Sequence, residues 1–244
     1  MKLAQARRPT TSKPRLISTW LLRPLLLLLT AALLYQSWFL LHIVYWRSYS
    51  PTTSAFMQDR LTIMRQQNPA AELQHRWVDY EQISSHLKRA VVAAEDARFL
   101  QHQGFDYKAI ETAWKKNLKQ RKWAAGGSTI SQQLAKNLFL STEKTVWRKS
   151  QETLITLMLE EFLTKRRILE IYLNIIEWGD GIFGIEAAAR HYFGISAASL
   201  TPAQAAWLAS IIPNPRFYDT RRTLPKLLNK SRIILSRLPA AKIP

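Results

Sequence analysis

Two adjacent carboxylates, Glu95 and Asp96, are the first side chains in this sequence with the chemistry of a general acid or base. They follow the apolar run 91–94 and so fall at the C-terminal end of a helix predicted over 86–95. The negative pole of the helix dipole disfavours an anion at that end, and partial burial has the same effect, so the pKa of a carboxyl there rises. A raised pKa suits a general base that works near neutral pH. The alternative is a solvated helix end whose acids pair with Arg98.

A second group surrounds a glycine turn. Gly126 and Gly127 break the chain, and Ser128 and Thr129 then open a helix predicted over 130–138. Such a helix start points backbone N–H groups and the positive end of the dipole at an anion, which suits a phosphate. The helix also carries a polar strip with one cation, as expected beside a sugar and a phosphate; the alternative is an ordinary capped surface helix. The strip consists of Gln132, Gln133, Lys136 and Asn137.

The third group combines basic and acidic side chains. Arg148 and Glu152 share one face of a helix predicted over 142–163, and Lys149 lies next to Arg148 in the chain. Glu152 leads into the apolar run 154–159, so it is either a partnered buried charge or a residue of a functional site. The alternative is a surface ion pair that contributes little to stability.

A fourth group contains a helix and a glycine-rich turn. The segment 165–176 has helical periodicity, and the stretch 178–189 follows it. Within that stretch 179–184 spells G-x-G-x-x-G, but the dinucleotide motif needs a preceding strand, and here a helix precedes it. Ser-x-x-Lys occurs at 85–88 and at 141–144 without Lys-Thr-Gly, so a penicillin-binding transpeptidase site is not indicated. We interpret the fourth group as scaffold.

Local signals place these groups on helices. Thr129 with Gln132 and Thr201 with Gln204 are capping-box patterns, and Pro202 suits a first helical position. Strand signals are nearly absent, so the predicted fold class is mainly α. The expected helices of the domain cover 86–95, 107–118, 130–138, 142–163, 165–176 and 202–211.

The composition excludes several classes of protein. The chain has 244 residues and no cysteine, which excludes a disulfide scaffold, a thiolate metal site and a cysteine nucleophile. A net charge of +18 would suit nucleic acid, but the charge is unevenly distributed. Segments 1–46, 107–150 and 216–244 carry +6, +8 and +7, whereas 151–215 carries −3.

Residues 24–46 form an apolar segment without Asp, Glu, Lys or Arg. At about 1.5 Å per helical residue it can cross about 30 Å of hydrocarbon. The tail 1–23 holds six basic side chains, so the positive-inside rule places it in the cytoplasm and the remainder outside, which argues against a nucleic-acid partner. The alternative, a cleaved signal peptide, normally has a shorter apolar core that ends in small residues. We expect a single-pass anchor, a connector over 47–78 and a domain over 79–244.

Together the four groups resemble the family 51 peptidoglycan glycosyltransferases. The blocks that carry the resemblance are E-D-x-x-F-x-x-H-x-G-x-D at 95–106, G-G-S-T-I-x-Q-Q-x-x-K-N at 126–137, R-K-x-x-E at 148–152 and the segment 165–189. They occur in the family's order and cover roughly 80–215. The segment 174–184 is similar to the monofunctional members of Gram-negative bacteria, and few residues follow Pro213. We therefore expect no transpeptidase activity.

The resemblance implies a fold, a reaction and residue roles. The fold is a lysozyme-like helical head with a small membrane-associated jaw, placed at about 107–140 because the stretch 114–123 interleaves Trp with Lys. The reaction is an inverting transfer of a glycan chain from undecaprenyl pyrophosphate to the GlcNAc 4-hydroxyl of lipid II. The catalytic residues are Glu95, as general base, and Glu152, which orients a divalent metal (Mg or Mn) or the nearby cations; no organic cofactor is expected. The substrate-binding residues are Asp96, Phe99, His102, Ser128, Thr129, Gln132, Gln133, Lys136, Asn137, Arg148 and Lys149.

The resemblance also implies a location and partners. The domain would work at the periplasmic face of the inner membrane, with lipid II, the lipid-linked glycan and the membrane as partners, and with cell-division or wall-synthesis proteins as candidates. Two other classes stay open. A lytic glycosidase also uses a key Glu in a helical fold, but it needs no cations for a pyrophosphate. A membrane-anchored scaffold would bind wall-synthesis proteins without polymerising lipid II.

Overall fold

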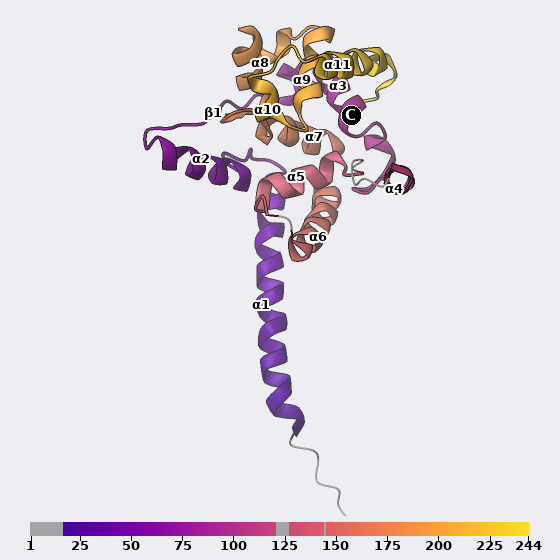
Figure 1. Cartoon of the computed structure of the whole chain (residues 1–244). Coiled ribbons are helices and arrows are strands. Elements are labelled where there is room, and N and C mark those ends of the chain that lie inside the picture. The colour runs from indigo at the N-terminus through magenta and orange to yellow at the C-terminus, as the bar shows by residue number, and fades with distance from the viewer. Residues whose placement is uncertain (1–16, 121–126, 144) are drawn as a thin grey trace, which may run out of the picture. The chain divides into compact units, whose positions relative to one another are not determined.

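The computed structural model describes residues 17–120, 127–143 and 145–244 (Figure 1). The predicted mainly α fold class is confirmed, since helices make up most of the described chain. The chain divides into two compact units, Met1–Phe39 and Leu40–Pro244. The second unit contains all four groups of residues on which the sequence analysis rests.

The first helix, α1, spans Ile17–Tyr45. Its segment Leu22–Tyr45 has a mean hydropathy of 1.8 and is long and apolar enough to cross a membrane. Most of its leucines are exposed, which is consistent with membrane anchoring. The anchor predicted over 24–46 agrees with this segment, whereas residues 1–16 of the basic tail lie outside the described residues.

The chain that follows α1 is fastened to the helical head. Arg167 donates from Nε to the carbonyl oxygen of Trp46 at 2.8 Å and from Nη2 to that of Tyr49 at 2.6 Å. The ring of Trp46 packs on Phe139, with 5.1 Å between ring centres. The expected connector 47–78 contains the helix α2 (Ala55–Gln67), which packs against α5, and the strand β1 (Gln74–His75).

Two groups of helices build the head. Helices α3 (Ser85–Glu95), α9 (Pro202–Ile211) and α11 (Pro225–Arg237) pack on one another at one end, and α5 (Ile130–Phe139) packs on α6 (Val146–Phe162) and α7 (Lys165–Ile175) (Figure 1). All but α11 were predicted. The start predicted for α6 at 142 was wrong, because Thr145 and not Thr142 provides the cap: its hydroxyl accepts from the backbone N–H of Arg148.

Short elements complete the head. Two strands, β2 (Glu177–Gly179) and β3 (Ile182–Phe183), join β1 in a sheet of the order β1-β3-β2. Strand β1 is parallel to β3, and β2 is antiparallel to it. The G-x-G-x-x-G sequence lies in the β2–β3 hairpin and not in a βαβ unit, so it is no dinucleotide site. Helix α4, predicted over 107–118, is confirmed, but residues 121–123 of the basic aromatic stretch lie outside the described residues. The remaining elements are α4 (Tyr107–Gln120), α8 (Ile185–Phe193), α10 (Pro215–Asp219) and four 3-10 turns at Tyr80–Gln82, Phe99–Gln101, Ala197–Ser199 and Leu238–Ala240.

Candidate active site

Glu95 is half-buried at the C-terminal end of α3. Burial raises the pKa of its carboxyl, and the negative charge of Asp96 adds to the rise. A hydrogen bond from Gln133 and the positive charges of Lys230 and Lys136 act in the opposite direction. The pKa stays above its ordinary value, in the direction expected from the sequence, so this carboxyl is suited to accept a proton near neutral pH.

Gln133 connects Glu95 to the interior of the head. Its Nε2 donates to Oε2 of Glu95 at 2.8 Å, and its Oε1 accepts from the hydroxyl of Tyr172 at 2.9 Å. Asn137 donates from Nδ2 to the backbone oxygen of Gln133 at 2.7 Å. Gln133, which was predicted to bind substrate, therefore contacts the candidate base directly, and Asn137 contacts the backbone of Gln133.

The start of α5 is held by the capping box that the sequence predicted. The hydroxyl of Thr129 accepts from the backbone N–H of Gln132, and Oε1 of Gln132 accepts from the backbone N–H of Thr129 at 3.0 Å. The same hydroxyl donates to the carbonyl oxygen of Gly104 at 2.6 Å. Gln132 is thus buried in the helix start, whereas Ser128 is exposed beside it. The hydrogen bond from Thr129 to Gly104 therefore connects the start of α5 to the loop that follows Glu95.

Asp96, Phe99 and His102 are brought together in that loop. Oδ1 of Asp96 lies 2.9 Å from Nε2 of His102, and its Oδ2 accepts from the backbone N–H of Ile130 at 3.1 Å. An acidic side chain at the positive end of α5 is favourably placed. Phe99 is fully buried, with the ammonium of Lys165 4.5 Å from its ring centre. These contacts fix the loop on α5.

Glu152 is buried on α6 between two cations. Its Oε2 accepts from Nη1 of Arg148 at 2.9 Å, and its Oε1 accepts from Nζ of Lys149. Half of the Lys149 side chain is exposed, so its ammonium remains accessible to solvent. In the part of the chain that the structure describes, Nε of Arg148 is buried without a hydrogen-bond partner.

The donor atoms do not fit a bound divalent metal. Both oxygens of Glu152 are engaged by cations, which a metal would have to displace. Asp96, His102 and Asp106 place their ligand atoms within 4.8 Å of one another, but both oxygens of Asp106 accept from the guanidinium of Arg98. Glu152 is therefore better described as the residue that orients two cations.

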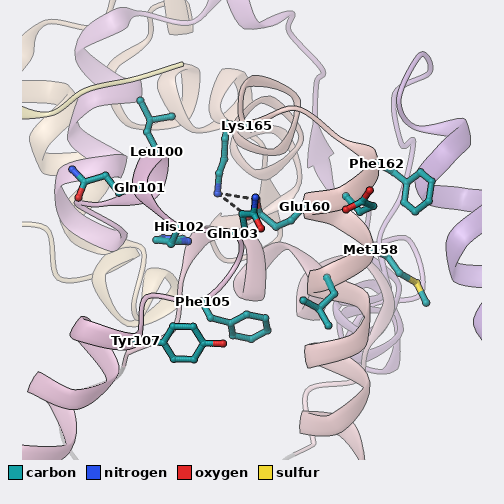
Figure 2. A pocket seen from close by; sticks show the side chains of 12 residues that line it. Leu100, Gln101, His102, Gln103, Phe105, Tyr107, Met158, Glu160, Phe162 and Lys165 are labelled. Atoms are coloured by element: carbon teal, nitrogen blue, oxygen red, sulfur yellow. Dashed lines mark hydrogen bonds and ion pairs between the residues drawn. The ribbon is translucent and has the colours of Figure 1, made fainter.

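Two cavities flank the loop after Glu95. One of about 470 Å³ is lined by Glu95 itself together with Lys108 and Ser128. A larger one of about 1070 Å³ lies between the loop and α6, where Lys165 reaches Glu160 (Figure 2). Because Glu95 lines only the smaller of the two, that cavity is the one which presents the candidate base to a ligand.

Two residues near Glu95 were not predicted. Tyr172 is fully buried on α7, within a segment that we interpreted as scaffold. Lys230 on α11 donates from Nζ to the carbonyl oxygen of Ser210 at 3.3 Å. Burial lowers the pKa of this ammonium, and the charge of Glu95 opposes that effect. No motif in the sequence analysis singles out Tyr172 within α7, and Lys230 lies on α11, which was not predicted.

A helical head with a partly desolvated carboxylate beside cations defines a candidate glycosyl-transferring site, and the comparisons identify its family. The family model described as Transglycosylase matches residues 61–239, and this chain belongs to that family. The relatives include proteins named biosynthetic peptidoglycan transglycosylase. That of Nitrosomonas europaea is 98% identical over the whole of both chains, and that of Nitrosomonas eutropha is 82% identical over the same extent. That of Nitrosospira multiformis is 58% identical over 92% of this chain and 98% of its own.

Proposed function

We propose that this protein is a peptidoglycan glycosyltransferase that polymerises lipid II into linear glycan strands. The observation that carries the proposal is the environment of Glu95: a carboxylate with a raised pKa, held by Gln133 and lining a cavity. Family membership and the printed names of the relatives support the same class of reaction. The Ser-x-x-Lys sequences occur without Lys-Thr-Gly, so the proposed activity includes no transpeptidation.

The proposed reaction is a single inverting displacement. The 4-hydroxyl oxygen of the GlcNAc of lipid II attacks the anomeric carbon of the donor MurNAc, and Glu95 takes the proton from that hydroxyl. The new glycosidic bond forms as the bond to the undecaprenyl pyrophosphate breaks, and the pyrophosphate leaves with the electron pair. Attack from the opposite face converts the α linkage of the donor into a β linkage. A positioned base contributes on the order of 10²–10⁴ in rate.

The cations have the task of neutralising the departing pyrophosphate. Lys136 lies on α5 together with Gln133, and its positive charge lowers the pKa of Glu95, which supports a place near the candidate base. The side chain of Lys149 is half-exposed, and Arg148 lies beside it at the start of α6. Glu152 holds both side chains in one orientation. Preorganised cations stabilise charge that develops in the transition state, and no metal step is needed for this mechanism.

The proposed location is the periplasmic face of the inner membrane. The apolar segment Leu22–Tyr45 supports a single-pass anchor, and the basic side chains before it support a cytoplasmic N-terminus. Helix α4 supports a membrane-facing jaw, because it exposes a row of apolar side chains at helical spacing. The row consists of Tyr107, Ile110, Trp114 and Leu118.

The proposal is tested with detergent-solubilised protein and labelled lipid II, with the products resolved on a gel. Wild type and Glu161→Gln, which removes an exposed carboxylate on α6, are expected to form polymer, whereas Glu95→Gln is expected to lose at least a hundredfold in rate. Near wild-type turnover by Glu95→Gln would refute the role of Glu95. Release of muropeptides from purified peptidoglycan would favour the lytic glycosidase, and binding of wall-synthesis proteins without any polymer would favour the scaffold.

A further inference from the structure

A fully buried tyrosine is connected to the candidate base through one amide. Tyr172 donates its hydroxyl hydrogen to Oε1 of Gln133 at 2.9 Å, and Gln133 donates from Nε2 to Oε2 of Glu95 at 2.8 Å. The three residues come from α7, α5 and α3, so only the packed head brings them together. The contact between α5 and α7 fixes the distance between the tyrosine and the amide.

The hydroxyl of Tyr172 keeps its proton and donates a hydrogen bond to Gln133 in this arrangement. Burial raises the pKa of the Tyr172 hydroxyl well above its ordinary value, and the negative charges of Glu95 and Asp96 raise it further. The hydroxyl therefore keeps its proton over the whole range in which an enzyme works. A hydroxyl hydrogen that points at Gln133 needs an acceptor there, and the amide oxygen is the only acceptor on that side chain.

The direction of the amide follows from the direction of the hydroxyl. Because Oε1 of Gln133 faces Tyr172, the amide nitrogen must face Glu95. The reverse orientation would place a carbonyl oxygen against a carboxylate. The phenol oxygen would then have to accept from the amide N–H, which takes the acceptor away from a buried hydroxyl hydrogen. Without the tyrosine hydroxyl, the amide oxygen loses its donor, and only the carboxylate of Glu95 still favours the observed orientation.

We propose that Tyr172 is a positioning residue for glycosyl transfer, which orients Gln133 so that its amide N–H holds Oε2 of Glu95 and leaves Oε1 for the acceptor hydroxyl. This inference rests on the proposed role of Glu95 as general base. It assigns a function to a side chain of the fourth sequence group, which otherwise forms part of the scaffold.

The decisive variant is Tyr172→Phe, which removes one oxygen atom and retains the packing of the ring. We expect kcat to fall on the order of tenfold at neutral pH, a loss comparable with that of one charge-assisted hydrogen bond. We also expect the acid limb of the kcat profile to move to higher pH, since Glu95 loses a donor that favours its ionised form. The KM for lipid II should change little, because Tyr172 does not touch substrate.

Tyr80→Phe is the matched control. Tyr80 is also buried, but its hydroxyl donates to the carbonyl oxygen of Pro244 at 2.7 Å and not to the site. It should match Tyr172→Phe in thermal stability and leave the acid limb unchanged. If both variants lower kcat equally without a shift of the limb, the role of Tyr172 is structural and the proposal is wrong.

Two further measurements test the connection from Tyr172 through Gln133 to Glu95. In a Gln133→Ala background, Tyr172→Phe should have no further effect on the acid limb; an additive effect would overturn the proposal. The titration of the Glu95 carboxyl, followed by NMR and assigned with Glu95→Gln, should shift to higher pH in Tyr172→Phe. An unshifted titration would overturn the proposal without any assay of turnover.

The same variants separate this inference from the proposed function. If wild type forms polymer and Glu95→Gln does not, but Tyr172→Phe behaves as wild type, only the positioning role of Tyr172 fails. If wild type forms no polymer, the proposed function fails.

Discussion

Arg148 and Glu152 form an ion pair along α6, with 2.9 Å between Nη1 and Oε2. Only 5% of the Glu152 side chain is exposed, and Lys149 engages its other oxygen. A buried carboxylate between two cations cannot be removed without leaving positive charge uncompensated. The same contacts set the directions in which the two cations point, so in the proposed mechanism both stability and catalysis depend on one side chain.

Glu152→Gln tests this dual role. We expect the free energy of unfolding to fall by about 3 kcal/mol, because the buried guanidinium loses its ionic partner. We also expect kcat/KM to fall on the order of 100-fold, because the cations lose their common orientation. Thermal melts and lipid II polymerisation check the two effects, with Glu161→Gln on the exposed face of the same helix as control. An unchanged rate would show that Glu152 is purely structural.

Glu95→Gln should raise the stability of the folded protein, whereas Glu152→Gln should lower it. The raised pKa of Glu95 means that the native state binds this proton more tightly than the unfolded chain, so its contribution to stability falls as pH rises from the ordinary value of 4.5 through the raised pKa. A neutral amide avoids that loss. The inactive variant should therefore melt about 2–4 °C above wild type at neutral pH, and the difference should shrink at about pH 4. Equal melting temperatures at neutral pH would contradict the desolvated carboxylate.

Lys230→Met should change the pH dependence of the reaction. The ammonium of Lys230 favours the ionised form of Glu95, so its removal raises the pKa of Glu95 further and moves the acid limb of the kcat profile to higher pH. The rate just above that limb should fall on the order of threefold. Lys230→Arg should restore the profile, and Lys226→Met, an exposed change on the same helix, should leave it unaltered. A shift of equal size in both methionine variants would indicate a general charge effect.

The two capping boxes provide a matched pair of variants. Thr129→Ala and Thr201→Ala each remove a hydroxyl that caps a helix, at a cost of about 1 kcal/mol. Thr129→Ala also removes the hydrogen bond to Gly104, so it should cost more. Because α5 carries Gln133 and Lys136, we expect Thr129→Ala to lower kcat severalfold and Thr201→Ala to leave it unchanged. Thermal melts and the polymerisation assay distinguish the two; an equal loss of rate would contradict a special role for the start of α5.

Local signals were sufficient wherever one short segment decides the structure. Both capping boxes depend on side chains three residues apart, and both are present as predicted. The pKa of Glu95 is raised chiefly by burial, which the apolar run before it indicates, and the charge of the neighbouring Asp96 adds to the rise. The remaining predicted site residues lie in the same helices and loop as expected, but their roles in binding substrate stay predictions.

Helix α11 was not predicted, although Leu227, Ile234 and Leu238 recur at helical spacing and form a buried side, so here a local signal was overlooked. Other features depend on contacts between distant segments. The strands of two or three residues are too short to show an alternating pattern. The hydrogen bond between Tyr172 and Gln133 exists only because α7 packs on α5, which no local pattern specifies.

Helix α5 is secured at both of its ends. At its start the hydroxyl of Thr129 binds the carbonyl oxygen of Gly104, and at its finish Phe139 packs against Trp46, which follows the anchor. A helix fixed in this way offers its amides and its ammonium in a geometry that exists before any ligand arrives. The entropy of ordering Gln133 and Lys136 is then lost once, during folding, and not again in each cycle of the proposed glycan extension.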